Sequence, residues 1–229
     1  MSDLCITRIE PLPPKGLRVR VHQDMGDPFE VALEAIELAH LGVGDALTPT
    51  ARAALFGADA DVRVREAALA LLSHRARTRQ ELQRKLRGKR FDAARVDACL
   101  DRLAERGLLS DEAVAAAFVR DRLRFRPRGR ARLTSELRTK GVAAEVAEDT
   151  IARVFEDEAV SDAQLARESA SGWLARQGDE LRAGLGSAAP TPERDKARRR
   201  LHGYLARRGF RGEALTDAMR HAEREARGD

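Results

Sequence analysis

Leucines four residues apart recur in three basic segments of the chain, at Leu82 and Leu86, at Leu133 and Leu137, and at Leu201 and Leu205. A spacing of four returns a side chain to the same face of an α-helix. Each segment is therefore predicted to form a helix with one narrow apolar seam, whose remaining surface carries Lys and Arg into solvent. The phrases KLRGKRF, ELRTKGV and YLARRGF mark the predicted ends of these helices.

The three segments belong to an internal repeat. A displacement of 51 residues places Leu82 on Leu133 and Lys89 on Lys140, and a displacement of 68 residues aligns the second copy with the third. The third copy is longer because residues 178–195 form an insertion that contains Gly, Pro and Ser. Self-similarity at a fixed period is the signature of a repeat architecture.

Apolar periodicity and capping residues divide each copy into three helices. They are predicted at residues 64–74, after Thr78 and after Asp92 in the first copy, at 111–125, 130–140 and 144–156 in the second, and at 162–177, 192–207 and 212–227 in the third. Asp92, Ser161 and Thr191 are predicted N-caps. We place the repeats at residues 59–109, 110–160 and 161–229.

Residues 1–58 lack this helical pattern. The runs ITRIE, LRVRVHQ and PFEVAL alternate or are rich in β-branched residues, and PLPPKG and DMGD separate them. They predict a three-stranded meander and then a helix near residues 34–41. The expected fold is mainly α, with three tandem three-helix repeats in an elongated array and a small N-terminal β-strand accessory region.

The turn after the second helix of each repeat is predicted from its glycine. Gly141 and Gly209 follow basic pairs at the position where a helix often ends in the left-handed conformation. The first copy has Arg90 at this position, and Gly88 comes two residues earlier. We therefore expect the first turn to differ locally, through an earlier end of its helix.

Composition places the chain among soluble globular proteins. Of its 229 residues, 43% are hydrophobic and 34% are charged. No apolar run approaches the roughly 20 residues of a membrane span, and the N-terminus lacks the pattern of a signal peptide. We expect a cytoplasmic monomer without a membrane association. Cys5 and Cys99 have no spacing that suggests a disulfide or zinc, so both are expected to be reduced.

Charge is strongly segregated along the chain. Residues 75–90, 120–140 and 194–211 each carry a net charge of +7, whereas the whole chain carries only +5, so that −16 remains for the other residues. Alternating basic and acidic blocks suit a protein that meets a polyanion or an acidic partner surface.

The candidate binding residues are basic side chains of these three blocks. They are Arg75, Arg77, Arg84, Lys85, Arg87, Lys89, Arg124, Arg126, Arg128, Arg130, Arg132, Arg138, Lys140, Arg198, Arg199, Arg207 and Arg208. The stretch RDRLRFRPRGRAR is the most suggestive, because its charges surround a helix end and a loop where packing is not expected to explain them. The alternative for any one arginine is a surface ion pair with an acidic third helix, for example through Asp97 or Glu148.

Other chemistry is weakly represented. The five histidines show no HExxH motif, and GLGSA at residues 184–188 lacks the lysine of a phosphate-binding loop. We predict no catalytic residue, no cofactor and no metal. Aromatic residues are scarce, which argues against extensive base stacking, and Trp173 is expected to cap the core of the third repeat.

The order and spacing of four segments resemble the regulatory protein RecX family. These segments are LLSHRARTRQELQRKL, LAERGLLSDEAVAAAFVRDRLR, RARLTSELRTKGV and LARRGF, within residues 67–222. The sequence departs from the family pattern at Leu108, where an aromatic residue is common, at Arg90 and in the insertion at residues 178–195. These departures concern turn geometry and the placement of the third repeat.

The resemblance implies a fold and a function. Members of this family have three tandem three-helix repeats, bind the RecA recombinase in the groove of its filament on DNA, and restrain strand exchange, ATP hydrolysis and co-protease action. Members also bind DNA. By resemblance, the chain would be a non-enzymatic modulator of recombination and the SOS response. The alternative is a stand-alone DNA-binding protein with helix-turn-helix-like units, although its second helices carry few Asn or Gln residues for base readout.

Overall fold

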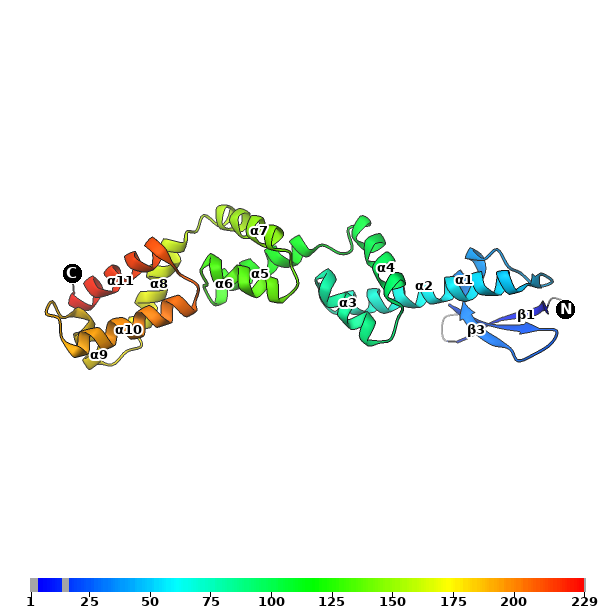
Figure 1. The fold of residues 1–229 in the computed structure, drawn as a ribbon, viewed down its shortest axis with the longest axis horizontal. Coiled ribbons are helices and arrows are strands. Elements are labelled where there is room, and N and C mark those ends of the chain that lie inside the picture. Colours follow the sequence, from blue (N-terminus) through cyan, green and yellow to red (C-terminus); the bar gives the residue numbers. More distant parts are fainter. Residues whose placement is uncertain (1–3, 14–16, 229) are drawn as a thin grey trace. The chain divides into compact units, whose positions relative to one another are not determined.

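The computed structural model describes residues 4–13 and 17–228, and it divides into two compact units (Figure 1). Unit 1 comprises the residues before Thr78 and residues 81–109, and unit 2 comprises residues 78–80 and those from Ser110 onward. Residues 14–16, in the predicted connection between the first two strands, lie outside the described residues.

Unit 1 begins with an antiparallel sheet. Its strands are β1 (Leu4–Pro11), β2 (Arg18–Gln23), β3 (Phe29–Ala32) and β4 (Ala46–Leu47), in the order β3-β2-β1-β4. The predicted meander of the first three strands is confirmed. β4 was not predicted, because two residues are too few to show alternation. Helix α1 (Leu33–Leu38) follows the meander and is shorter than predicted.

The next helix, α2 (Pro49–His74), packs against the sheet and also forms part of the first repeat. Its hydroxyl cap is Thr48, whose Oγ1 accepts a hydrogen bond from the Ala51 amide at 3.1 Å. Val62 is buried in the core of the sheet, whereas Val64 is buried in the core of the first repeat. The predicted helix start near residue 64 and the predicted boundary at residues 58 and 59 therefore fall inside one continuous helix, in which the apolar side faces two different cores in succession.

Two further helices complete the first repeat, namely α3 (Arg79–Gly88) and α4 (Ala93–Glu105). Asp92 caps α4 as predicted, since its Oδ1 accepts a hydrogen bond from the Arg95 amide at 3.0 Å. Leu82, Leu86 and Leu100 are fully buried and share one core with Val64 and Ala68 of α2.

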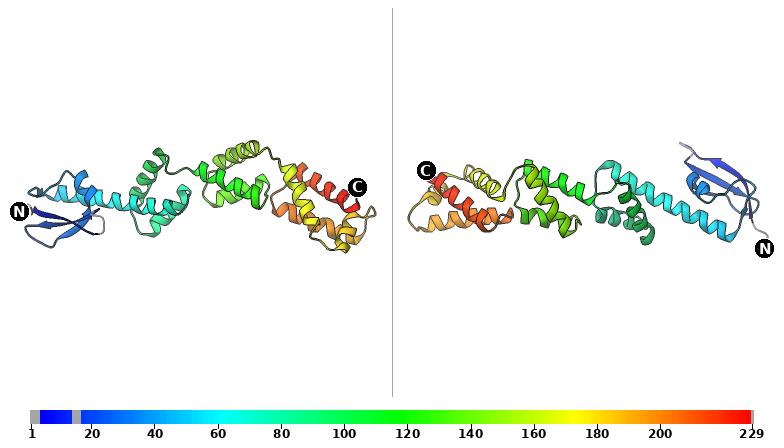
Figure 2. Two further views of the ribbon diagram at one scale, coloured as in Figure 1. Left: turned by 180° about the vertical axis from the view of Figure 1, so that it is seen from behind. Right: turned by 90° about the horizontal axis from the view of Figure 1, so that it is seen from above.

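Unit 2 contains the second and third repeats around one continuous core. The second repeat consists of α5 (Asp111–Phe125), α6 (Arg130–Thr139) and α7 (Ala144–Asp157). The third consists of α8 (Asp162–Leu174), α10 (Pro192–Arg207) and α11 (Gly212–Arg227), which lie side by side in the views of Figures 1 and 2. The caps predicted at Ser161 and Thr191 are present.

The insertion at residues 178–195 contains a helix that the sequence pattern did not predict. This helix, α9 (Asp179–Gly186), packs on α10 and α11 and buries Leu185 completely. Its glycines permit the close packing, because a Cβ at Gly186 would lie 2.7 Å from the Ala226 carbonyl oxygen. The short length of the helix and its glycines weaken the helical signal of this segment, so tertiary contacts decide its structure.

The leucine seams are confirmed in all three repeats. The side chains are fully buried at Leu82 and Leu86 in α3, at Leu133 and Leu137 in α6, and at Leu201 and Leu205 in α10. Each burial contributes about 1.5–3 kcal/mol relative to an exposed leucine. Because the seam is narrow, most other positions of these helices face solvent.

The first turn does not differ from the other two, contrary to the prediction. Arg90 itself adopts the left-handed conformation with φ of 65°, and both Gly141 and Gly209 have φ of 88°. Helices α3, α6 and α10 also end at equivalent residues, Gly88, Thr139 and Arg207. The Arg90 amide donates to the Arg87 carbonyl at 2.9 Å, and the Gly141 amide donates to the Arg138 carbonyl at the same distance. The turn geometry is thus common to all three repeats, whichever residue occupies it.

Backbone contacts join the second and third repeats within unit 2. The Gly129 amide donates to the Arg208 carbonyl at 2.9 Å, and the Arg130 amide donates to Asp162 Oδ1 at 3.1 Å. A Cβ at Gly209 would lie 2.5 Å from the Arg132 amide nitrogen. We call this region, residues 127–132 with residues 208–210, the joint. Its close approach requires glycine.

Replacing Arg90 with Gly should stabilise unit 1. A non-glycine residue in the left-handed region costs about 1–2 kcal/mol, and the added flexibility of glycine offsets part of this gain. We expect Arg90→Gly to raise the free energy of unfolding by up to about 1 kcal/mol in urea denaturation. Lys89→Gly removes the same charge at a position without positive φ and should lower that free energy. A loss of stability in Arg90→Gly would show that the turn is not strained.

Replacing Gly209 with Ala should weaken the joint. The left-handed φ and the close approach of Arg132 together predict a loss of about 2–4 kcal/mol in the unfolding free energy of unit 2. Gly212→Ala is the matched control, since Gly212 also has positive φ, but a methyl group added there would meet no atom within 4 Å. Equal losses in the two variants, measured by thermal and urea denaturation, would show that the close approach contributes nothing.

Candidate functional site

The basic residues of the first repeat divide into supporting and exposed side chains. Arg77 is only 9% exposed, and it donates to the Leu71 carbonyl and to Glu81. Arg75 also donates to Glu81. Burial alone would raise the pKa of Glu81, but the hydrogen bonds from Arg75 and Arg77 together lower it by more. The pKa of Glu81 therefore lies below its ordinary value. Arg77 is therefore held by contacts within unit 1.

The basic residues of α3, the second helix of the first repeat, are partly paired within the repeat and partly exposed. Arg87 pairs with Asp97 of α4 at 3.2 Å, as expected for an ion pair within the repeat. Arg84, Lys85 and Lys89 are exposed, and among the described residues their side chains make no hydrogen bond or ion pair. These three cations remain accessible to a partner.

In the second repeat an arginine occupies the position of Glu81, the acid that pairs with Arg75 and Arg77 in the first repeat. The displacement of 51 residues places Arg128 on Arg77 and Arg132 on Glu81. Arg128 is half-buried, and its Nε has no hydrogen-bond partner within the described part of the chain. Burial lowers the pKa of Arg128, and the neighbouring charge of Arg208 lowers it further. Arg128 lies in the joint, and its role as a binding residue stays a prediction.

Arg130, Arg132 and Lys140 are also engaged within unit 2. The Arg130 guanidinium lies over the ring of Phe155 at 4.2 Å, and Lys140 lies over the ring of Phe118 at 5.0 Å. Arg132 pairs with Glu136 at 2.8 Å. The two ring contacts hold Arg130 and Lys140 without neutralising them, because a cation over a ring keeps its charge.

The remaining candidates of the second repeat are exposed. Arg124 lies beside the Phe125 ring, 5.2 Å from its centroid. Arg126 and Arg138 are exposed, with no side-chain hydrogen bond or ion pair to the residues that the structure describes.

In the third repeat, α10 carries cations on two different faces. Arg198 pairs with the buried Glu223 of α11 at 2.7 Å. Arg208 donates to the Pro127 carbonyl at 3.1 Å and lies over the Tyr204 ring at 4.6 Å. The side chains of Arg198 and Arg208 are therefore both engaged in contacts within unit 2. Arg199 and Arg207 point away from the core and line a groove.

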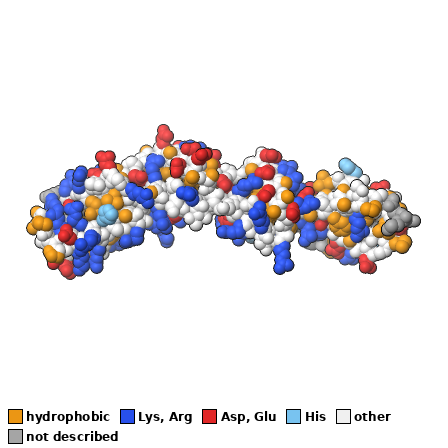
Figure 3. All heavy atoms as spheres, viewed as in Figure 1, with side chains coloured by type: hydrophobic (Ala, Val, Ile, Leu, Met, Phe, Trp, Pro, Cys, Tyr) orange, Lys and Arg blue, Asp and Glu red, His pale blue; other side chains and the backbone are white. Residues whose placement is uncertain are grey.

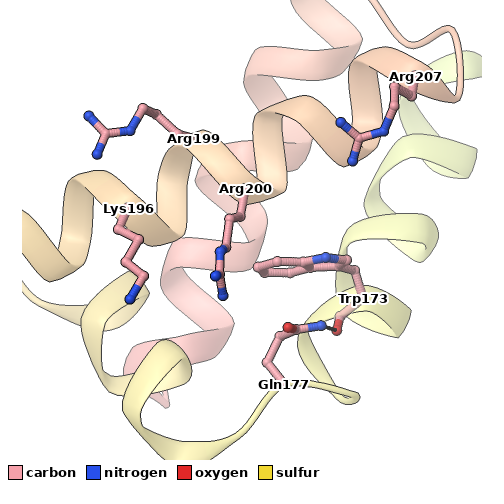
Figure 4. A pocket seen from close by; sticks show the side chains of 6 residues that line it. All are labelled: Trp173, Gln177, Lys196, Arg199, Arg200 and Arg207. Carbon is pink, nitrogen blue, oxygen red and sulfur yellow. Dashed lines mark hydrogen bonds between the residues drawn. The ribbon is translucent and has the colours of Figure 1, made fainter.

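This groove, which we call the α10 groove, gathers four basic side chains of α10. It has a volume of about 570 Å³ and is lined by Trp173, Gln177, Lys196, Arg199, Arg200 and Arg207 (Figure 4). In Figure 4 the Arg200 side chain points toward the indole of Trp173, and the Gln177 amide lies below the indole and donates to the Trp173 carbonyl at 2.8 Å. The lining contains four cations and no carboxylate.

The cations of the α10 groove share one helix face. Lys196, Arg200 and Arg207 lie four and seven residues apart, whereas Ala197, Leu201 and Leu205 form the buried seam. Figure 3 shows Lys and Arg side chains gathered over α10, whereas acidic side chains gather over α7. The net charge of residues 194–211 does not distinguish the two faces of α10. The prediction from this charge selected Arg198, which is paired, and missed Lys196, Arg200, Trp173 and Gln177; the helical spacing of Lys196 and Arg200 would have identified the two cations.

The chemistry available in the groove is anion binding. Guanidinium groups donate paired hydrogen bonds to phosphate or carboxylate, and Lys196 adds a compact charge. Within residues 4–13 and 17–228, no group of three or more His, Cys, Asp or Glu side chains is placed to hold a metal ion. No helix in the described ranges is long and apolar enough to cross a membrane.

Comparison with known proteins matches both of the first two repeats. Residues 65–103 match the RecX first three-helix domain, and residues 110–151 match the RecX second three-helix domain. A regulatory protein RecX from Halorhodospira halophila is 35% identical over 162 residues, which cover 71% of this chain and 89% of that protein. One from Mycobacterium sp. (strain JLS) is 38% identical over 66% of this chain and 76% of that protein.

Solved structures share the fold. A crystal structure of regulatory protein RecX has a TM-score of 0.73 and 23% identity, and the match covers 93% of this chain and 97% of that one. The structure of RecX from Lactobacillus salivarius has a TM-score of 0.54 and 19% identity over 72% of this chain and 98% of that one. The two domain matches and the extent of sequence identity lead to one conclusion: the chain belongs to the RecX family of regulatory proteins.

Proposed function

We propose that this chain is a non-enzymatic regulator that binds the RecA recombinase filament on DNA and restrains its strand exchange, ATP hydrolysis and co-protease action. Its role would lie in DNA repair and the SOS response. The family assignment supports a regulatory role, and the cation-lined α10 groove is the observation that carries the contact with a filament containing nucleic acid.

Exposed cations in every repeat fit a repetitive partner. The second helix of the first repeat carries Arg84 and Lys85, the second repeat carries Arg126 and Arg138, and the third carries the α10 groove. A filament presents the same surface many times, so several weak contacts in one chain act together through their high effective concentration. No single contact needs to be tight.

The α10 groove suits a phosphate backbone better than a specific base sequence. Lys196 and Arg207 are separated by about 16 Å along the helix axis, given the rise of about 1.5 Å per residue. This length spans several nucleotides. The lining offers cations and one amide but few groups that read base edges, so contacts would be independent of sequence.

The alternative function, a stand-alone DNA-binding protein with helix-turn-helix-like units, would use the same cations. Its recognition helices would be α3 and α6, which have only ten residues each. Exposed Arg and Lys dominate these helices, and they contact phosphates more readily than they specify a sequence. We therefore favour a regulator whose DNA contacts accompany a protein partner.

The first test measures RecA directly. Adding the chain to RecA on single-stranded DNA should lower the rate of DNA-dependent ATP hydrolysis in a concentration-dependent manner. DNA binding by the chain alone is measured in parallel. Tight sequence-specific binding to duplex DNA together with no effect on RecA would contradict the proposal and support the alternative.

The second test concerns the α10 groove. Lys196→Glu combined with Arg200→Glu should weaken binding to a dT oligonucleotide and flatten the plot of log affinity against log salt by about 1.4, at about 0.7 per lost contact with a single strand. Fluorescence anisotropy at several salt concentrations measures both effects. Both side chains lie on the outer face of α10, so the thermal midpoint should change little.

A matched variant controls for net charge. Arg220→Glu combined with Arg224→Glu reverses two exposed charges on α11, outside the groove lining. We expect a smaller loss of affinity and a nearly unchanged salt slope. Equal effects of the two double variants would mean that overall charge, and not the groove, determines oligonucleotide binding.

A further inference from the structure

A second hollow lies beside the joint. Its volume is about 260 Å³, and its lining includes Phe125 and Arg126 at the end of α5, Ser169 and Gly172 of α8, and Tyr204 and Arg208 of α10. Tyr204 lines this hollow, and its ring lies 6.2 Å from the ring of Trp173, which lines the α10 groove. We call this second hollow the joint hollow.

The joint hollow presents unusually accessible apolar surface. Phe125 is 66% exposed although it is a large aromatic residue at the end of a helix. Gly172 leaves space in the floor, since a Cβ built there would meet only the Arg176 guanidinium, at 3.6 Å. Burying the Phe125 ring against a partner would remove substantial apolar area from water, which is the usual source of a binding hot spot.

One largely buried polar group in the lining has no protein partner. Ser169 is only 9% exposed, and across the described residues its hydroxyl makes no hydrogen bond. Covering this hydroxyl without pairing it would cost about 1–3 kcal/mol, so the site favours a ligand that supplies a donor or acceptor. Arg126 is exposed at the rim, and the Arg208 guanidinium is held over the Tyr204 ring at 4.6 Å.

The lining matches a polypeptide better than a nucleic acid or a small molecule. Small-molecule sites usually have volumes of roughly 300–1,000 Å³, so a hollow of about 260 Å³ is suited to a single large side chain. The lining also mixes the carboxylate of Glu168 with the guanidinium groups of Arg126, Arg176 and Arg208, beside the exposed Phe125 ring. A polypeptide can match apolar groups and charges of both signs together, whereas a phosphate backbone matches only the cations. The α10 groove has no carboxylate in its lining, and this contrast separates the two sites.

We propose that the joint hollow docks a segment of a partner protein, which inserts one large apolar side chain between Phe125 and Gly172 and places flanking carboxylates on Arg126 and Arg208. The inference rests on the proposed function and deepens it, because a regulator of a protein filament needs a surface that recognises protein. The α10 groove would then contact the polyanion, and the joint hollow would contact the polypeptide.

The test fills the hollow without changing any charge. Gly172→Leu places a side chain in the floor, and it also improves helix propensity, so the variant should fold. We expect binding to RecA filaments assembled on poly(dT), measured by co-sedimentation, to weaken at least tenfold. Binding to a dT oligonucleotide without RecA should be unchanged. Ala175→Leu, at an exposed position of the same helix end outside both linings, should behave as the wild type in both assays.

A second variant tests the exposed ring. Phe125→Ala should also weaken filament binding by about tenfold, with little change in thermal midpoint because the ring is mostly exposed. Filament binding by Gly172→Leu at wild-type strength would overturn the docking inference and leave the proposed function intact. An equal loss of oligonucleotide binding would overturn it in favour of a nucleic-acid site. Failure of the wild-type chain to bind RecA filaments would overturn both proposals.

Discussion

The narrow leucine seam of the second helix is the constraint on which each repeat depends. Two fully buried leucines anchor α3, α6 and α10 to their cores. A helix held by so narrow a stripe must leave most of its circumference in water. The same feature that stabilises the repeat therefore determines how much surface is available for Lys and Arg, and it separates the structural part of each helix from the part that can evolve toward a partner.

The arginines show that charge content and charge availability are different properties. Arg77 and Arg198 satisfy internal carboxylates, whereas Arg199 and Arg207 face a groove on the same chain. The replacement of the acidic Glu81 position by Arg132 in the second repeat is especially informative. The second repeat keeps both arginines without this acid, so that the Nε of Arg128 has no hydrogen-bond partner within the described residues, whereas Arg77 donates to Glu81.

The sequence was informative where periodicity and caps act locally. It predicted the seams, the strands of the meander and the bounds of α5, α10 and α11, because these depend on spacing and terminal residues within one element. It failed for α9, whose glycines pack against α10 and α11, and for the start of α2, whose apolar face changes partners along the helix. Local patterns also did not predict the surroundings of Arg128, because the neighbouring Arg208 lies far away in the sequence.

The shared helix α2 also affects how unit 1 unfolds. Its N-terminal half is tied to the sheet through Asp59, whose Oδ1 accepts from the Ala32 amide at 2.7 Å, and its C-terminal half forms part of the first repeat. Breaking a helix in its middle exposes backbone groups on both sides of the break, so the two halves tend to melt together. The small sheet therefore gains cooperativity that a sheet of its size lacks alone, and amide hydrogen exchange in its strands becomes coupled to the opening of the first repeat.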